Sequence, residues 1–180
     1  MIFVLKMLNR IVLFFIFLGI FSASFAVGAE VQVSEEESAI VLEQFESLIG
    51  NIDAVGIFVH NLSLSIPMFI PGFGIAWGAF AAFSTGMAFS VLQNANPMLE
   101  NIPSLTILFM SPFGLMEVAA YSIAMSRSYM IVHKMIKRIP IRQDFRVIGL
   151  EIAILVGLLL AGGFVEYYFI ESLSTDMPKI

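Results

Sequence analysis

Apolar residues run along this chain in long blocks, separated by short polar or proline-containing segments. The first block begins at Ile11 and fades into small residues up to Ala29, and further blocks lie at 54–70, 74–93, 105–133 and 147–170. A membrane-spanning helix needs about 20 mainly apolar residues. The pattern therefore predicts an all-α fold, a polytopic transmembrane helix bundle of four or five spans.

The first block fits two interpretations. Lys6 and Arg10 are the only charges before it, and small residues follow its apolar centre, as in a secretory signal peptide. The segment 11–28 is also close to spanning length, as in an uncleaved anchor helix. Residues 1–29 are therefore predicted to be a signal peptide or an N-terminal anchor, and both place Lys6 and Arg10 in the cytoplasm.

The next segment, 30–53, is acidic and amphipathic. Ser34 followed by Glu37 is a capping box, which satisfies backbone N–H groups at a helix start. Apolar residues then recur at helical spacing and polar ones take the opposite face, the apolar set being Val41, Leu42, Phe45, Leu48, Ile49 and Ile52. We expect an external amphipathic helix that lies on the membrane surface or the bundle, or that docks a partner.

Proline and glycine interrupt the apolar blocks twice. The sequence Pro71-Gly72-Phe73-Gly74 ends the block 54–70, and Ser111-Pro112-Phe113-Gly114 divides a block that is too long for one span. We expect a short half-helix or re-entrant piece before Pro112 and a full span after it, to about His133. Broken backbone at membrane depth must be shielded by protein or water.

Composition and charge support a membrane location. Hydrophobic residues make up 59% of the chain and charged residues 13%, whereas a soluble domain has about 25% charged residues. The segment 134–146 carries five cations and one acid, Asp144. Because positive loops stay in the cytoplasm, this segment is predicted inside and 30–53 outside. Residues 54–171 then form the bundle of a multi-pass cell-membrane protein, with an external tail at 172–180.

Small residues form two strips at successive i+4 positions. Each is smooth enough for another helix to approach closely, although a permeation pathway lined by small residues is the alternative. The first strip contains Gly74, Gly78, Ala82, Gly86 and Ser90, and the second contains Gly149, Ala153, Gly157 and Ala161.

A few ionisable residues lie near or within the predicted spans. Such residues are costly in lipid and are usually paired or functional. Glu151 is the natural partner for Arg127, because both lie near the cytoplasmic ends of their spans. Glu117, Asn61 and Glu166 form the candidate intramembrane polar site, either a structural network or a functional one.

Other chemistry finds little support in the residues. The chain has no cysteine, and His60 and His133 lack metal-motif spacing. No serine–histidine–acid arrangement and no basic, aromatic-rich patch for nucleic acid is visible. We expect no catalytic residue, no metal and no cofactor.

The order of these features resembles the stage II sporulation protein M family of prokaryotic membrane proteins. The resemblance covers about Phe58 to Glu166. It comprises an Asn in the first core span, a glycine-rich turn and span, Pro112-Phe113-Gly114-Leu115-Met116-Glu117, and a final small-residue span ending in Glu166. The family usually has His where Phe113 stands and Asn where Thr85 stands, so no role of that His is carried over.

The resemblance implies a membrane scaffold, since the family's namesake looks like one that recruits cell-wall hydrolases. The missing catalytic arrangement, the small-residue strips and the external amphipathic helix also favour a non-enzymatic scaffold or accessory subunit. Its expected partners are the bilayer and other membrane or cell-envelope proteins, or a second copy. The alternatives are a permease or transporter subunit with a polar site around Glu117, and, less favoured, an intramembrane enzyme.

Overall fold

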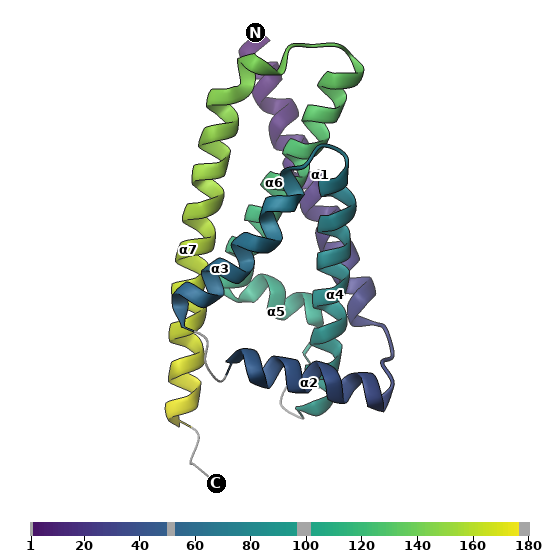
Figure 1. Cartoon of the computed structure of the whole chain (residues 1–180), viewed down its shortest axis with the longest axis vertical. Helices are drawn as coiled ribbons and strands as arrows, with labels where there is room; N and C mark the ends of the chain where they lie inside the picture. Colours follow the sequence, from purple (N-terminus) through teal and green to yellow (C-terminus); the bar gives the residue numbers. More distant parts are fainter. Residues whose placement is uncertain (1, 50–52, 97–101, 177–180) are drawn as a thin grey trace.

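The computed structural model describes residues 2–49, 53–96 and 102–176. Every regular element in these ranges is a helix (Figure 1), which confirms the all-α fold class. In chain order the elements are α1 (Ile2–Ala29), α2 (Glu35–Ile49), α3 (Ala54–Ser65), η1 (Ile66–Phe69), α4 (Phe73–Ala95), α5 (Ser104–Met110), α6 (Pro112–Ile136), η2 (Ile141–Asp144) and α7 (Phe145–Asp176).

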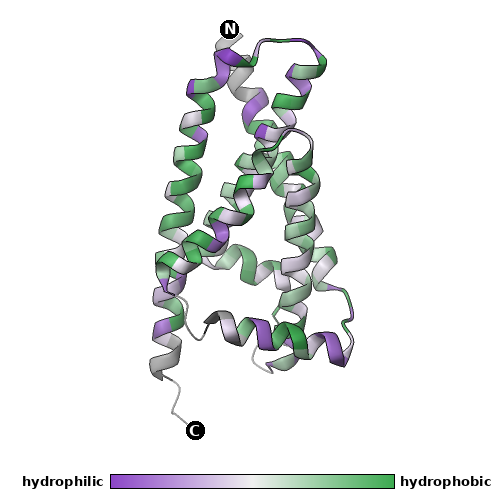
Figure 2. Cartoon of the chain, in the orientation of Figure 1, coloured by the Kyte–Doolittle hydropathy of each residue, from purple (hydrophilic) through white to green (hydrophobic). Residues whose placement is uncertain are grey.

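Three described segments are long and apolar enough to cross a bilayer, namely Asn9–Ala29, Phe73–Ala95 and Ile141–Ser172. A fourth crossing is added if α5 and α6, which are bent by 90° at their junction, are counted as one broken span. Figure 2 shows hydrophobic residues along these helices and polar residues gathered toward the two ends of the molecule. This arrangement is compatible with a membrane location.

The expected span at residues 54–70 is shorter than a bilayer requires. α3 has 12 residues and η1 continues it for 4 more. Pro67 has no backbone N–H and its ring crowds the preceding turn, so the α-helix ends at Ser65. At 1.5 Å per residue, α3 is about 18 Å long. It crosses the bundle diagonally (Figure 1), and a total of five spans is not confirmed.

The turn between η1 and α4 is held by one serine of α6. Gly72 adopts a φ of 81°, which favours a residue without a side chain. The Ser128 hydroxyl donates to the Ile70 carbonyl at 2.7 Å and accepts from the Gly72 N–H at 3.1 Å. The backbone groups freed by the chain reversal are thus satisfied inside the protein, as the sequence required.

The break before α6 follows the predicted position. α5 ends at Met110 and α6 begins at Pro112. Proline at the first helical position needs no N–H partner. Ser111 caps the new helix, since its hydroxyl oxygen accepts from the Gly114 N–H at 3.2 Å. The predicted break at Pro112, with a short helix before it, is therefore confirmed.

The predicted capping box begins α2. The Ser34 hydroxyl donates to Glu37 Oε2 at 2.7 Å, and the Ser34 N–H donates to the same oxygen at 3.3 Å. These bonds lower the pKa of Glu37 because they favour its charged form. Their contribution to helix stability is present above the unfolded pKa and is lost as the pH falls through the folded one.

α2 lies across the end of the bundle that is remote from the α6–α7 connection (Figure 1). Its neighbour among the long helices is α4. Three glutamates, Glu35, Glu36 and Glu37, occupy its first turn, where they complement the helix dipole. Ile40 and Phe45 of the same helix are exposed.

The small-residue strip of α4 is buried along its length and contacts three different elements. A Cβ on Gly74 would overlap with the backbone of Met68 in η1, and one on Gly78 would overlap with the Met125 side chain of α6. A Cβ on Gly86 would overlap with the backbone of Phe25 and Ala29 in α1. Ala82 lies between them and has no exposed surface.

The second strip faces outward. Gly149, Ala153, Gly157 and Ala161 are all exposed on α7, and a Cβ on Gly149 or Gly157 would meet no atom within 4 Å. The packing role predicted for Gly157 is therefore not found within the chain. α7 instead packs through Gly162 and Gly163, which are buried against α6 and α3.

These two glycine environments give a matched test of packing. We expect Gly86→Ala to lower the free energy of unfolding by about 1–3 kcal/mol, because the added methyl group overlaps with fixed backbone atoms of α1. Gly157→Ala should leave stability unchanged or raise it slightly. Thermal unfolding of the full chain in mild detergent measures both, and equal effects would show that α1 and α4 are not in close contact.

Candidate functional site

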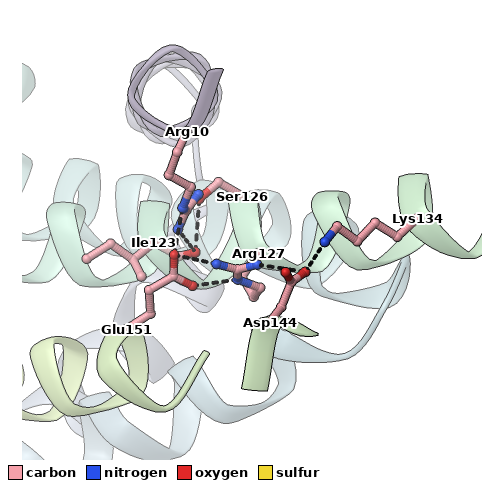
Figure 3. Close-up of polar contacts among 7 residues, drawn as sticks. All are labelled: Arg10, Ile123, Ser126, Arg127, Lys134, Asp144 and Glu151. Atoms are coloured by element: carbon pink, nitrogen blue, oxygen red, sulfur yellow. Dashed lines mark hydrogen bonds and ion pairs between the residues drawn. The ribbon is translucent and has the colours of Figure 1, made fainter. Parts of the chain in front are cut away.

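Two groups of polar residues stand out in the part of the chain that the structure describes. The first, here called the ionic cluster, consists of Arg10, Arg127, Lys134, Asp144 and Glu151 (Figure 3). Glu151 is its centre, because its carboxylate receives two guanidinium groups. Arg127 Nε donates to Oε2 at 2.5 Å and Nη2 donates to Oε1 at 2.6 Å. Arg10 Nε donates to Oε1 at 2.6 Å.

The ionic cluster joins four elements. Arg10 comes from α1, Arg127 and Lys134 from α6, Asp144 from η2 and Glu151 from α7. Asp144 extends the chain of contacts, since it pairs with Lys134 and its Oδ2 lies 3.9 Å from Arg127 Nη1. The remaining donors of Arg10 also reach α6, with Nη1 2.5 Å from Ser126 Oγ and Nη2 3.3 Å from the Ile123 carbonyl.

Burial of Arg127 and Glu151 raises the energetic cost of breaking these contacts. Arg127 is 1% exposed and Glu151 is 8% exposed. Bidentate pairing of guanidinium with carboxylate is geometrically specific, and an unpaired charge at such a position would be heavily penalised. The ionic cluster therefore acts as a clamp that sets the relative position of α1, α6 and α7.

The predicted pair of Arg127 and Glu151 is confirmed. Sequence reasoning missed Arg10, which looked like an ordinary charge before an apolar block. It also missed the role of Asp144. Asp144 is the only acid in the segment 134–146, which could have marked it as a partner for one of the cations. Gly28, in the same helix as Arg10, packs closely against the backbone of Phe83 in α4. The choice between a signal peptide and an anchor for residues 1–29 stays a prediction.

The second group, here called the carboxyl cluster, contains the three residues of the predicted polar site. Asn61 Nδ2 of α3 donates to Glu117 Oε1 of α6 at 2.7 Å. Glu166 of α7 lies near enough to Glu117 for the two carboxyl groups to hydrogen-bond. Asn61 is 7% exposed. The structure thus brings together three side chains from three different helices.

Small residues of α7 allow this approach. A Cβ on Gly163 would lie 3.0 Å from the Ala54 carbonyl oxygen and 3.1 Å from the Phe58 nitrogen, both in α3. Gly162 faces α6 in the same way, with Met116 as its neighbour. Since Glu166 follows within one helical turn, it is carried to the junction of α3, α6 and α7, where Glu117 and Asn61 meet.

The side chains of the two histidines are exposed, unlike that of Asn61 in the carboxyl cluster. His60 is exposed on α3, and His133 is exposed near the end of α6, where its ring stacks on Tyr129 at 6.1 Å. Among the residues that the structure describes, no three His, Asp or Glu side chains form a group suited to a metal ion.

Comparison with family models, with curated proteins and with solved structures found no match to this chain. The resemblance to the stage II sporulation protein M family therefore stays a prediction from the residues.

The ionic cluster yields a stability prediction. We expect Glu151→Gln to lower the free energy of unfolding by about 3–5 kcal/mol, because it leaves two guanidinium groups without their carboxylate. The double variant Glu151→Leu, Arg127→Leu should recover part of that loss, since it removes both members of the buried pair. Thermal unfolding in detergent measures both effects. A double variant less stable than Glu151→Gln would contradict this description.

The carboxyl cluster yields a second prediction. Glu117→Gln keeps the size of the side chain and can still accept a hydrogen bond from Asn61, so we expect a folded protein of similar stability. Glu117→Leu leaves the buried amide without its acceptor and should cost about 1–3 kcal/mol. Asn61→Leu in the Glu117→Leu background is the control, and it should restore part of the loss. Equal melting temperatures for all variants would mean that this hydrogen bond contributes nothing.

Proposed function

We propose that this chain is a non-enzymatic, multi-pass membrane protein that acts as a scaffold or accessory subunit of a membrane complex. The observation that carries the proposal is the ionic cluster, in which the buried charges bond helices to one another. A scaffold needs a fixed arrangement of helices so that its outer elements keep a constant position. A clamp across α1, α6 and α7 supplies this rigidity.

α2 is the element that we propose to contact the partner. It lies across one end of the bundle (Figure 1) and combines an acidic first turn with the exposed apolar residues Ile40 and Phe45. Apolar side chains ringed by charge are typical of interaction surfaces. The proposed partner is another membrane or cell-envelope protein.

The proposal places α2 outside the cell and the basic segment 134–146 in the cytoplasm, because positive loops are retained there. Cysteines introduced at Gln44 and Gln143, both exposed in a chain without native cysteine, provide the test. We expect an impermeant maleimide to label Gln44→Cys in intact cells and Gln143→Cys only after lysis. Labelling of both positions in intact cells would contradict this topology.

The scaffold role is tested by partner retention. The full chain is purified in mild detergent, and the proteins that co-purify with it are identified and quantified. Ile40→Ser with Phe45→Ser should reduce recovery of the specific partner at least tenfold. Val55→Ser with Val59→Ser is the matched control, since these residues are exposed apolar residues of α3, and it should retain the partner. Equal recovery from both variants would refute a role for α2.

The carboxyl cluster favours a second candidate, a permease or transporter subunit. Two carboxyl groups that meet within a bundle cannot both be ionised at low cost. Broken helices such as α5 and α6 are also a common way of building intramembrane sites. A folded Glu117→Gln protein that loses function would favour this candidate over the scaffold.

A further inference from the structure

A groove of about 350 Å³ opens between α1 and α6. It lies near the end of α6 that leads into the basic segment 134–146, on the side of the ionic cluster away from the carboxyl cluster. Neither of the two polar clusters occupies it, although Lys134 belongs both to its lining and to the ionic cluster.

The groove is polar at one end and apolar at the other. Asn9, His133 and Lys134 line it where α6 approaches its last residues, and they supply amide, imidazole and ammonium donors. One helical turn deeper the lining is apolar apart from one phenol, and consists of Val12, Leu13, Tyr129 and Met130. Because α1 and α6 run in opposite directions, both helices contribute to each end.

The basic segment 134–146 begins at the polar end of the groove, with Lys134 in its lining. Lys137 lies four residues after His133, one helical turn beyond it, and is exposed. Arg138, Arg142 and Arg146 are also exposed. The only acid of this connection, Asp144, is occupied by Lys134 and lies near Arg127. An anionic group at this end would therefore meet cations that have no neutralising carboxylate within their own segment.

We propose that this groove binds one anionic phospholipid from the adjoining leaflet. Its phosphate lies between His133 and Lys137 with Asn9 beside it, and one acyl chain lies along Val12, Leu13 and Met130. The proposal rests on the membrane placement given above but not on the scaffold role. A basic pocket between spanning helices is a recurrent site for anionic headgroups, and the apolar lining is continuous with the lipid-facing surface of α1, where Ile11 and Phe15 are exposed.

The change from polar to apolar lining along the groove favours an anionic phospholipid over other occupants. A soluble phosphate compound would use the polar end alone and leave the apolar end empty. A neutral or zwitterionic lipid would fill the apolar end but would gain less from the excess positive charge. Only a molecule with both an anionic head and a hydrocarbon chain satisfies both ends of the groove.

The full chain in mild detergent can be titrated with phosphatidylglycerol and with phosphatidylcholine of the same acyl chains, and bound lipid counted by native mass spectrometry. We expect one phosphatidylglycerol to bind at least tenfold more tightly than phosphatidylcholine. Lys137→Gln should weaken phosphatidylglycerol about fivefold, as expected for one cation near a headgroup. Lys137→Arg should retain binding, and Val12→Trp should block both lipids by filling the apolar end.

Arg142→Gln is the matched control, because it removes one exposed cation from the same connection at a residue of η2, whereas Lys137 lies one helical turn from the lining residue His133. It should weaken phosphatidylglycerol less than Lys137→Gln does. Equal effects of the two variants would show that phosphatidylglycerol is attracted by the charge of the whole connection rather than bound in the groove, and would overturn the proposal. Equal affinity for the two lipids, or equally tight binding of glycerophosphoglycerol, which has the headgroup without chains, would overturn it as well.

The partner experiment on α2 is independent of these outcomes. Loss of the α2 partner with intact lipid selectivity would retain both proposals. Lipid selectivity without any α2 partner would refute the scaffold alone. If a second copy of the chain fills the groove instead, bound lipid should fall as dimer rises with protein concentration, and the lipid proposal would be wrong.

Discussion

The arrangement of the bundle depends on one carboxylate, that of Glu151, which receives guanidinium groups from α1 and α6 at 2.5–2.6 Å. Charges removed from water are tolerated only when they are paired with good geometry. Each of the three partners therefore constrains the other two, and helices that could slide along one another in a purely apolar contact are held at one register. Ser126 and Asp144 complete this arrangement by occupying further donors of the two arginines.

α6 links this constraint to the rest of the molecule. Its middle section is buried on most sides, with Val118, Ala124 and Met125 almost fully enclosed. Arg127 of α6 belongs to the ionic cluster, and the adjacent Ser128 holds the turn between η1 and α4. About two to three turns away α6 carries Glu117 in the carboxyl cluster. A shift of α6 would disturb both polar clusters, so the two are mechanically connected although no contact between them is needed.

The two small-residue strips show how such a bundle divides its surface. The strip on α4 is buried within the chain, where Gly78 and Gly86 allow α6 and α1 to come close. The strip on α7 stays on the surface, and α7 packs instead through Gly162 and Gly163. Gly162 and Gly163 also help to form the carboxyl cluster, because they bring α3 and α6 to the position of Glu166. Close packing and polar contact are therefore two results of the same glycine positions.

Much of the local structure followed from the sequence, because it depends on neighbouring residues. The helical fold, the break at Pro112, the Ser34–Glu37 capping box and the pairing of Arg127 with Glu151 are set by apolar block length, proline chemistry, hydrogen-bond spacing and charge near helix ends. The meeting of Asn61 with Glu117 was anticipated by depth alone.

Only the tertiary structure decided which surfaces meet. Sequence did not show that Arg10 reaches Glu151, that α3 stops short and crosses obliquely, or that Gly157 faces outward while Gly86 is buried. The physical reason is that lipid is as apolar as a protein core, so hydrophobicity cannot distinguish an inward face from an outward one. Small residues permit close approach on any face, and the choice among faces was made by the few polar side chains that needed partners.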